Sequence, residues 1–268
     1  MFSTRLLPRL LLLLVLALLS FQGNLVPDAI AQTPPRSPSD TVREFYKAMR
    51  EKRFKEAFAL SIYQPALDGL KKQEFDDLRP DFERVAHAVS EGIPVNLEIT
   101  GEQISGDAAD VFVRMMDSEG KPKIEPVALV KSNGIWIVGD RENQSLVKKA
   151  GKKFFFNARI EAHHADVQDM FTRISLALLL YSQQNNGKFA NIPTLITAGL
   201  IPKDLEGTAS TGYRFNIDLA ADGKSWTANA EPAQYGRTGL LSFYMDAAGV
   251  RSADIGGKRL SPPPSPRD

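Results

Sequence analysis

The sequence predicts an α+β protein of two domains that follow an export leader. Apolar residues recur at helical spacing over residues 37–89, and apolar and polar residues alternate as in antiparallel strands over residues 95–138. A second succession of a long helix and short strands begins near residue 157. The chain has 268 residues, 43% of them hydrophobic, which suffices for two domains of about 100 to 150 residues each.

The first residues carry the parts of a bacterial secretory signal in the usual order. Arg5 and Arg9 precede the apolar run 10–19, and a polar stretch then ends in Ala29 and Ala31, which form a small-x-small cleavage site. An uncleaved membrane anchor is the alternative, but the run is shorter than the roughly 20 apolar residues that cross a bilayer. We therefore expect cleavage after Ala31, a periplasmic or extracellular location, and no stable membrane span after cleavage.

Composition excludes several classes of function. The chain has no cysteine, so disulfides, thiolate metal sites, cysteine nucleophiles and a lipid-bearing cysteine are ruled out. Its formal net charge is +1, which gives no global electrostatic attraction for polyanions. Nucleic acid is therefore not expected as a partner.

Helices are expected at the start of the first domain. Ser37 has capping-box spacing to Asp40, and Pro38 stands at the first helical position, where its missing N–H costs nothing. After a short second helix, a third is expected over residues 66–89, with Pro80 as a kink or break. The apolar residues of the first two helices are Val42, Phe45, Tyr46, Met49, Phe54, Ala57, Phe58 and Leu60, and the first helix has an outer face of Arg43, Glu44, Lys47 and Arg50.

Strands are expected after the helices. Val95, Leu97 and Ile99 point to one side of the first expected strand, while the residues between them point to the other. Asn133 and Gly134 accept the positive φ angles of a tight hairpin turn. The expected strands cover residues 95–100, 109–115, 127–130 and 135–138.

Several motifs of this half occur together in one known fold. They are Ser37-Pro38 with Val42, Phe45, Tyr46 and Met49, then Phe54-Lys55-Glu56-Ala57-Phe58, Gly106-Asp107-Ala108-Ala109, Leu129-Val130-Lys131 and Gly134-Ile135-Trp136. With them, residues 37–140 resemble the nuclear-transport-factor-2-like cone fold, in a secreted bacterial branch of unknown function. That fold serves enzymes, binding modules and assembly domains alike.

The resemblance implies a cone whose interior can take a small hydrophobic ligand. Tyr46 is the candidate cone-cavity residue, although an aromatic residue on a regular helical stripe is more often part of the core. Family enzymes such as ketosteroid isomerases need a general base and proton donors that converge inside the cone. No motif identifies such a set here, so no catalytic residue is assigned.

Residues 141–156 form a linker of different character. Lys148, Lys149, Lys152 and Lys153 precede three consecutive phenylalanines, 154–156. A basic patch followed by aromatic residues can meet an anionic membrane surface. The pattern favours a solvated helix end, with the phenylalanines packing at the domain junction.

The second domain opens with the most regular helical pattern in the chain. Leu176, Leu179 and Leu180 add a second apolar face to this helix, so we expect its end to be covered on more than one side. Gly187 suits the left-handed cap that ends it. The main stripe is Ile160, His164, Val167, Phe171, Ile174, Leu178 and Tyr181, and the segments expected after the helix are a short helix at 193–198 and strands at 213–219, 225–230 and 240–244, with a hairpin at Asp222-Gly223.

A set of motifs relates this half to a second family. They are Leu178-Leu179-Leu180-Tyr181, Gly187-Lys188-Phe189, Ala198-Gly199-Leu200-Ile201-Pro202, Gly212-Tyr213-Arg214-Phe215, Tyr235-Gly236-Arg237-Thr238-Gly239, Ser242-Phe243-Tyr244-Met245-Asp246 and Gly249-Val250-Arg251. With them, residues 157–257 resemble the globular part of type IV pilins and type II secretion pseudopilins. True pilins begin with a prepilin peptidase site and a membrane-embedded helix. Here a folded domain precedes the helix, which favours a soluble module over a filament subunit.

No motif assembles a catalytic, cofactor or metal site. His163 and His164 lie beside Glu161 and Asp166, but adjacent residues on a helix point about 100° apart and cannot easily share an ion. The S-x-x-K spacing that begins at Ser145 lacks the S-D-N and K-T-G partners of penicillin-recognising enzymes. We therefore assign no cofactor and expect that the protein is not an enzyme.

The expected function is that of an exported, non-enzymatic binding or assembly protein, an accessory or scaffold of the cell envelope. Its expected partner is an envelope or secretion-system protein. The alternative is a small-molecule binder or enzyme that uses the cavity of the first domain. The predicted organisation is a signal peptide at 1–31, a linker at 32–36, the cone-like domain at 37–140, a linker at 141–156, the pilin-like domain at 157–257 and a Pro-rich disordered tail at 258–268.

Overall fold

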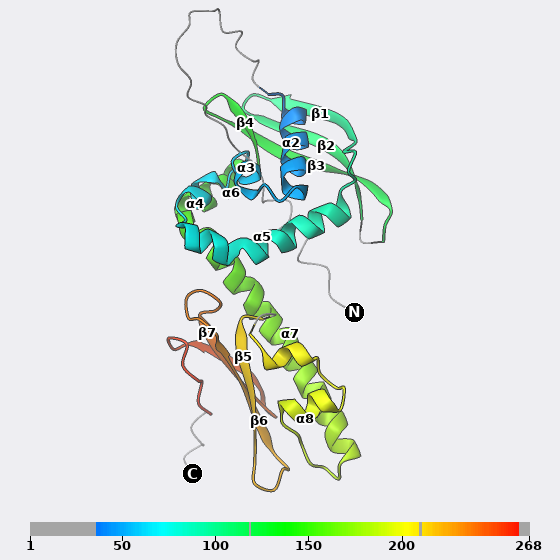
Figure 1. Cartoon of the computed structure of the whole chain (residues 1–268), viewed down its shortest axis with the longest axis vertical. Helices are drawn as coiled ribbons and strands as arrows, with labels where there is room; N and C mark the ends of the chain where they lie inside the picture. Colours follow the sequence, from blue (N-terminus) through cyan, green and yellow to red (C-terminus); the bar gives the residue numbers. More distant parts are fainter. Residues whose placement is uncertain (1–35, 118, 209–210, 263–268) are drawn as a thin grey trace, which may run out of the picture. The chain divides into compact units, whose positions relative to one another are not determined.

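The computed structural model describes residues 36–117, 119–208 and 211–262 (Figure 1). It contains helices and two four-stranded antiparallel sheets, which confirms the predicted α+β class. The chain divides into two compact units, a first that ends at Phe155 and a second that begins at Phe156. Ala29 and Ala31, the residues of the predicted cleavage site, lie outside the described residues. Within the described ranges, no helix is both long enough and apolar enough to span a bilayer.

The first helix of the first unit starts as the sequence predicts. Ser37 is its N-cap, and the Ser37 Oγ accepts a hydrogen bond from the Asp40 backbone N–H at 3.1 Å. Pro38 occupies the first helical position. The helices of this unit are α2 (Pro38–Arg50), α3 (Phe54–Phe58), α4 (Gln64–Asp68), α5 (Lys72–Gly92) and α6 (Arg141–Ala150), followed by the 3₁₀ turn η1 (Gly151–Lys153).

The third expected helix differs from the prediction in two ways. The segment forms two helices, α4 and α5, separated by residues 69–71. Pro80 does not break the chain into separate helices, because α5 continues through it. Pro80 lies on the exposed side of α5, where water can bond the carbonyl that loses its N–H partner, and Leu78 and Phe82 are buried on either side of it.

The sheet of the first unit has the order β1-β2-β3-β4, with neighbouring strands antiparallel. Asn133 and Gly134 have φ angles of 51° and 79°, so the predicted tight hairpin between β3 and β4 is confirmed. The first strand starts later than expected, and Val95 precedes it with 79% of its surface exposed. The strands are β1 (Ile99–Ser105), β2 (Ala108–Met116), β3 (Pro122–Ser132) and β4 (Ile135–Val138).

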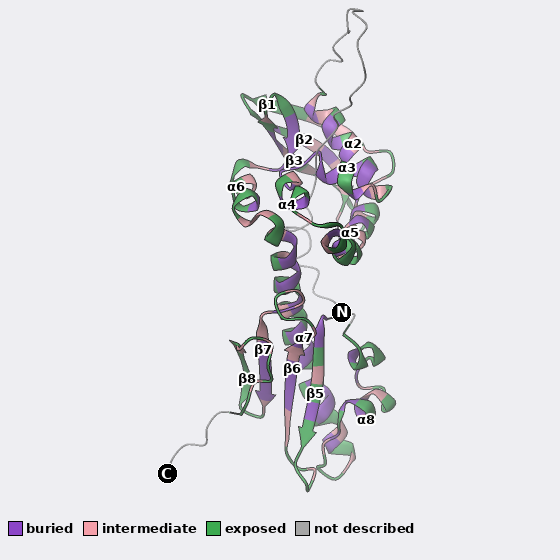
Figure 2. Cartoon of the chain, turned by 60° about the vertical axis from the view of Figure 1, so that its left-hand side comes forward, coloured by how far each residue is buried: buried purple, intermediate pink, exposed green. Residues whose placement is uncertain are grey.

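Helix α2 covers the buried side of this sheet and contacts β1, β2 and β4. Its apolar stripe is buried, as Figure 2 shows by colour, while its outer face stays partly or fully exposed. The buried sheet residues that share this core are Ala109, Val111, Val113, Val127, Leu129 and Val138.

A second part of the core in the first unit is aromatic. The ring of Phe82 lies 4.9 Å from that of Phe58 and 5.1 Å from that of Phe155, measured between centroids. Phe58 and Phe155 are themselves 5.3 Å apart, so the three rings close a triangle. Phe54 and Phe75 extend the cluster. The cluster joins α3, α5 and Phe155, which follows η1 and belongs to the first unit.

The second unit packs one long helix and one short helix with a four-stranded antiparallel sheet, around a single apolar core (Figure 1). The long helix starts six residues before Ile160, where the apolar pattern begins. Arg259 pairs with Asp218, so the described start of the predicted tail contacts this unit. A fourth strand, β8, was not expected. The elements are α7 (Phe154–Gln184), α8 (Ile192–Thr197), η2 (Lys203–Glu206), β5 (Tyr213–Leu219), β6 (Trp226–Pro232), β7 (Leu241–Asp246) and β8 (Gly249–Asp254).

The aromatic triangle makes a stability prediction. Phe82→Ala removes the ring that contacts the other members of the cluster, and we expect a loss of about 3–5 kcal/mol in the free energy of unfolding of the first unit. The measurement is urea unfolding followed by Trp136 fluorescence in a Trp226→Phe background, because the two tryptophans lie in different units.

The matched control is Leu146→Ala on α6. Leu146 is 54% exposed, so its truncation should change the free energy of unfolding by less than about 0.5 kcal/mol. Equal losses for the two variants would contradict the central role of the triangle.

Candidate functional site

Tyr46, the candidate cone-cavity residue, lies on α2 and is buried. Its ring centroid is 4.5 Å from that of Phe45, and burial raises the pKa of its hydroxyl. Two open clefts lie on the described surface of the first unit, and Tyr46 lines neither of them. The side chain therefore takes part in the packing between α2 and its surroundings.

The first of these clefts, called here the α2 cleft, has a volume of about 650 Å³. One wall consists of the exposed side of α2, and the other of the segment that leads into β1. Its lining residues are Arg43, Lys47, Arg50, Glu51, Val95, Asn96 and Leu97. The sequence predicts that Arg43, Lys47 and Arg50 lie on the outer face of the helix. Their i, i+4 and i+7 spacing indicates that the three cations share one side of it, but it does not show the second wall.

Arg50 connects the two walls of the α2 cleft. Its Nη1 donates to the Pro94 carbonyl at 3.2 Å, and its Nη2 donates to the Val95 carbonyl at 3.1 Å. Both acceptors are neutral, so these bonds fix the guanidinium without cancelling its charge. Val95, which precedes β1, thus bonds a side chain of α2 through its carbonyl.

The second cleft, of about 620 Å³, lies between Arg50 and the last turns of α5. Its charges are mixed, because Glu83 and Glu91 line it together with the cations Arg50, Lys52 and Arg84. His87 approaches Glu91 with a distance of 3.5 Å between Nδ1 and Oε2. This cleft offers no field of one sign to a ligand.

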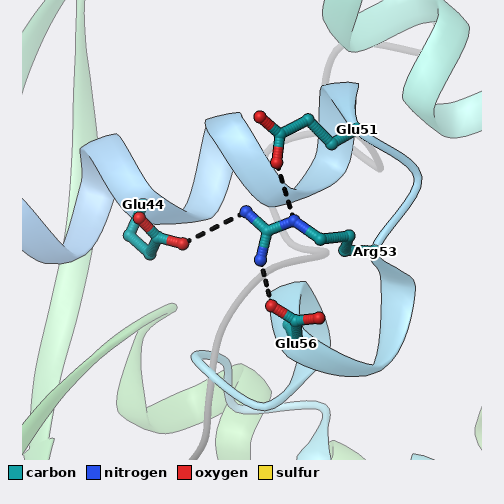
Figure 3. Close-up of polar contacts among 4 residues, drawn as sticks. All are labelled: Glu44, Glu51, Arg53 and Glu56. Carbon is teal, nitrogen blue, oxygen red and sulfur yellow. Dashed lines mark hydrogen bonds and ion pairs between the residues drawn. The ribbon is translucent and has the colours of Figure 1, made fainter.

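Arg53 holds three glutamates at the corner between α2 and α3 (Figure 3). Its Nε donates to Glu51 Oε2 at 2.7 Å and its Nη2 to Glu44 Oε1 at 3.2 Å, while Nη1 pairs with Glu56. The hydrogen bond to Glu51 is the largest cause of the raised pKa of Arg53. The carboxylate of Glu51, which lines the α2 cleft, is thus already bound by a cation.

The leucines near the end of α7 are exposed in the described structure. Leu176, Leu179 and Leu180 expose 57%, 52% and 47% of their surfaces, so the expectation that the chain itself covers this face is wrong. The opposite side of the helix supplies Ile174 and Leu178 to the core. We call the three exposed residues the leucine surface.

The two adjacent histidines of α7 hold a loop rather than a common ion. His163 Nδ1 lies 2.8 Å from the Thr238 carbonyl and must donate to it, while His164 Nε2 accepts from the Leu240 and Leu241 N–H groups at 3.3 and 3.4 Å. His163 is the more buried of the two, whereas the stripe placed His164 inside. The described residues contain no cluster of three or more His, Asp or Glu side chains suited to a metal ion.

Glycine is required where the chain approaches His163. A Cβ at Gly212 would lie 2.3 Å from His163 Nδ1, and Gly212 has a φ of 69°. A Cβ at Gly239 would lie 2.0 Å from the Tyr213 hydroxyl, which donates to the Leu241 carbonyl at 2.8 Å. Two of the motifs that suggested a pilin-like module therefore have packing roles in this unit.

Comparisons with known proteins give one structural likeness. No family model matches the chain, and no curated protein matches it. A solved structure from Campylobacter jejuni, described as an NTF2-like transpeptidase, is 16% identical and covers 38% of this chain and 96% of its own, with a TM-score of 0.26. A function must therefore be inferred from the residues of this chain.

The histidine contacts predict a pH dependence for the second unit. Burial lowers the pKa of His164 below its ordinary value of 6.5, and neighbouring His163 adds to the effect while Glu161 opposes it. The unfolded chain then binds a proton at a higher pH than the folded chain does. The contribution of this group to stability is present above about pH 6.5 and is lost as the pH falls through the folded pKa.

The measurement is urea unfolding between pH 5 and 8, read from Trp226 in a Trp136→Phe background. His164→Gln keeps an acceptor for the two N–H groups and cannot be protonated, so we expect a flatter profile on the acid side. His87→Gln is the control, because that exposed histidine belongs to the first unit. An unchanged acid slope in His164→Gln would refute the assignment.

Proposed function

We propose that this chain is an exported, non-enzymatic binding or assembly protein that serves as an accessory of the cell envelope. In this proposal the first unit is a nuclear-transport-factor-2-like domain and the second is a pilin-like module without a membrane-embedded segment. The leader motif supports export, and the helix-then-sheet order of each unit is compatible with the two family resemblances. The observation that carries the binding role is the exposed leucine surface of α7.

Exposed leucines at this spacing favour contact with another protein. Leu176, Leu179 and Leu180 follow one another at i, i+3 and i+4, so they share one side of the helix. Complete burial of a leucine side chain stabilises by about 1.5–3 kcal/mol, so covering the exposed halves is worth on the order of 1 kcal/mol each. Three such contacts suit the apolar centre of a reversible interface.

The charges on α7 specify the chemistry of the partner. Two exposed acidic residues, Glu161 and Asp169, lie in the turns before the leucine surface. Asp169 lies seven residues before Leu176, on the same side of the helix. The partner segment is therefore an amphipathic helix of an envelope protein, with apolar residues that meet the leucines and basic residues beyond them.

The leucine surface alone is too small for a stable dimer of this chain. A stable interface buries about 800 Å² per partner, several times what three half-exposed leucines supply. A helix that lies along α7 reaches both the leucines and the acidic turns, and so covers a larger area. A different protein is therefore favoured over a second copy.

Photo-crosslinking tests the proposal in the cells that produce the protein. A photoreactive amino acid at position 179 should give an adduct with one envelope protein, and the double change Leu176→Gln/Leu180→Gln should abolish that adduct. Exposed Asn216, on the side of β5 opposite to that of buried Ile217, is the control position and should give no such adduct.

The unfolding free energy of the double variant should stay within about 0.5 kcal/mol of the parent, since both positions are exposed. Equal background adducts at positions 179 and 216 would reject the proposal. An adduct between two copies of the chain would show that the leucine surface mediates self-association, and this result would also contradict the proposal.

A further inference from the structure

We propose that the α2 cleft binds a small amphipathic anion, a carboxylate or phosphate that carries a short apolar substituent. This site is separate from the leucine surface and does not depend on the proposed partner. It lies entirely within the first unit, on α2 and the segment before β1.

The cations of the cleft occupy one side of a helix. Arg43, Lys47 and Arg50 are spaced i, i+4 and i+7, which places them in a row along α2. The helix itself is fixed by its buried opposite side. A ligand in the cleft therefore meets three cationic side chains that project from one rigid element.

The cleft is positive because its lining has three cationic side chains, Arg43, Lys47 and Arg50, and one carboxylate, Glu51. Glu51 pairs with Arg53 through a bond of 2.7 Å between Oε2 and Nε. Arg50 bonds only neutral carbonyls in the described contacts, so its charge stays available to an anion. Arg43 forms an exposed ion pair with Asp40, with 3.6 Å between Nη1 and Oδ1, and water screens such a surface pair strongly.

Arg50 is also preorganised for binding. Two of its five N–H donors fix the side chain to the Pro94 and Val95 carbonyls, and three donors remain. A side chain that is already held in place loses less conformational entropy when a ligand binds. A carboxylate or phosphate can accept from the remaining donors, and Lys47 lies one helical turn away.

The other wall explains why the ligand has an apolar part. Val95 exposes 79% of its surface, and Leu97 lines the same wall. Contact with a short alkyl group would remove this apolar surface from water. The volume of about 650 Å³ lies within the range of roughly 300–1,000 Å³ found for small-molecule sites.

The neighbouring cleft supplies an internal comparison. It has a similar volume and shares Arg50, but its lining has two glutamates for the three cations Arg50, Lys52 and Arg84, whereas the α2 cleft has one glutamate for three cations. Selection of an anion should therefore depend on Lys47 and not on Arg84.

Calorimetric titration of the full mature chain tests the site with octyl phosphate, octanoate, octyl glucoside and inorganic phosphate. We expect octyl phosphate and octanoate to bind, octyl glucoside not to bind, and inorganic phosphate to bind more weakly than octyl phosphate. Lys47→Gln should lower the affinity for octyl phosphate about tenfold, the equivalent of about 1.4 kcal/mol in binding free energy. Arg84→Gln should leave this affinity unchanged. Val95→Ser should lower the affinity for octyl phosphate and leave the affinity for inorganic phosphate unchanged.

These variants are matched for exposure, since Lys47, Arg84 and Val95 all lie at the surface, so loss of folding does not explain a difference. Equal affinity for octyl phosphate and octyl glucoside, or an unchanged affinity in Lys47→Gln, would overturn the proposal. Binding to phosphatidylglycerol vesicles without binding to monomeric octyl phosphate would assign the cations to a membrane surface and also overturn it. Leu176→Gln/Leu180→Gln should bind the anion normally, so this test and the crosslinking test can fail separately.

Discussion

The contact among Phe58, Phe82 and Phe155 is the constraint on which the first unit depends. These rings come from α3, α5 and the first turn of α7, elements that are far apart in the sequence. Once Phe82 is buried between them, the direction of α5 is set, including its last turn. That turn leads directly into the segment whose carbonyls bond Arg50. The aromatic core thereby determines where one wall of the α2 cleft lies.

Helix α2 links this core to the surface because one of its sides is buried and the other is exposed. The stripe that includes Phe45 and Met49 is buried against the sheet, while the side with Lys47 faces outward. Arg53 binds Glu44, Glu51 and Glu56 at the end of the helix, and Glu51 is the one of these three that lines the cleft. The cleft is positive because Arg43, Lys47 and Arg50 outnumber this one carboxylate in its lining, although the net charge of the whole chain is only +1.

The second unit shows the same division between packing and recognition. His163 and His164 are residue types that can act in catalysis or metal binding. Here they bond the backbone of the loop at residues 238–241. The leucine surface makes no such contribution to the described core, and this contrast favours a role in binding. In this unit the two histidines thus serve packing, whereas the three leucines remain exposed.

The sequence by itself determined the α+β class, the helix start at Ser37, the hairpin at Asn133 and the buried stripe of α2, because capping, turn geometry and periodicity are local. It also located the cations of α2, but it did not bring Val95 beside Arg50 or Arg53 beside Glu51. Those contacts join side chains from different elements and depend on the packing of rings such as Phe82. The continuation of α5 through Pro80 and the exposure of the leucine surface were likewise decided only by the tertiary structure. A local pattern records which residues are apolar, and only the packed structure decides which of them are covered.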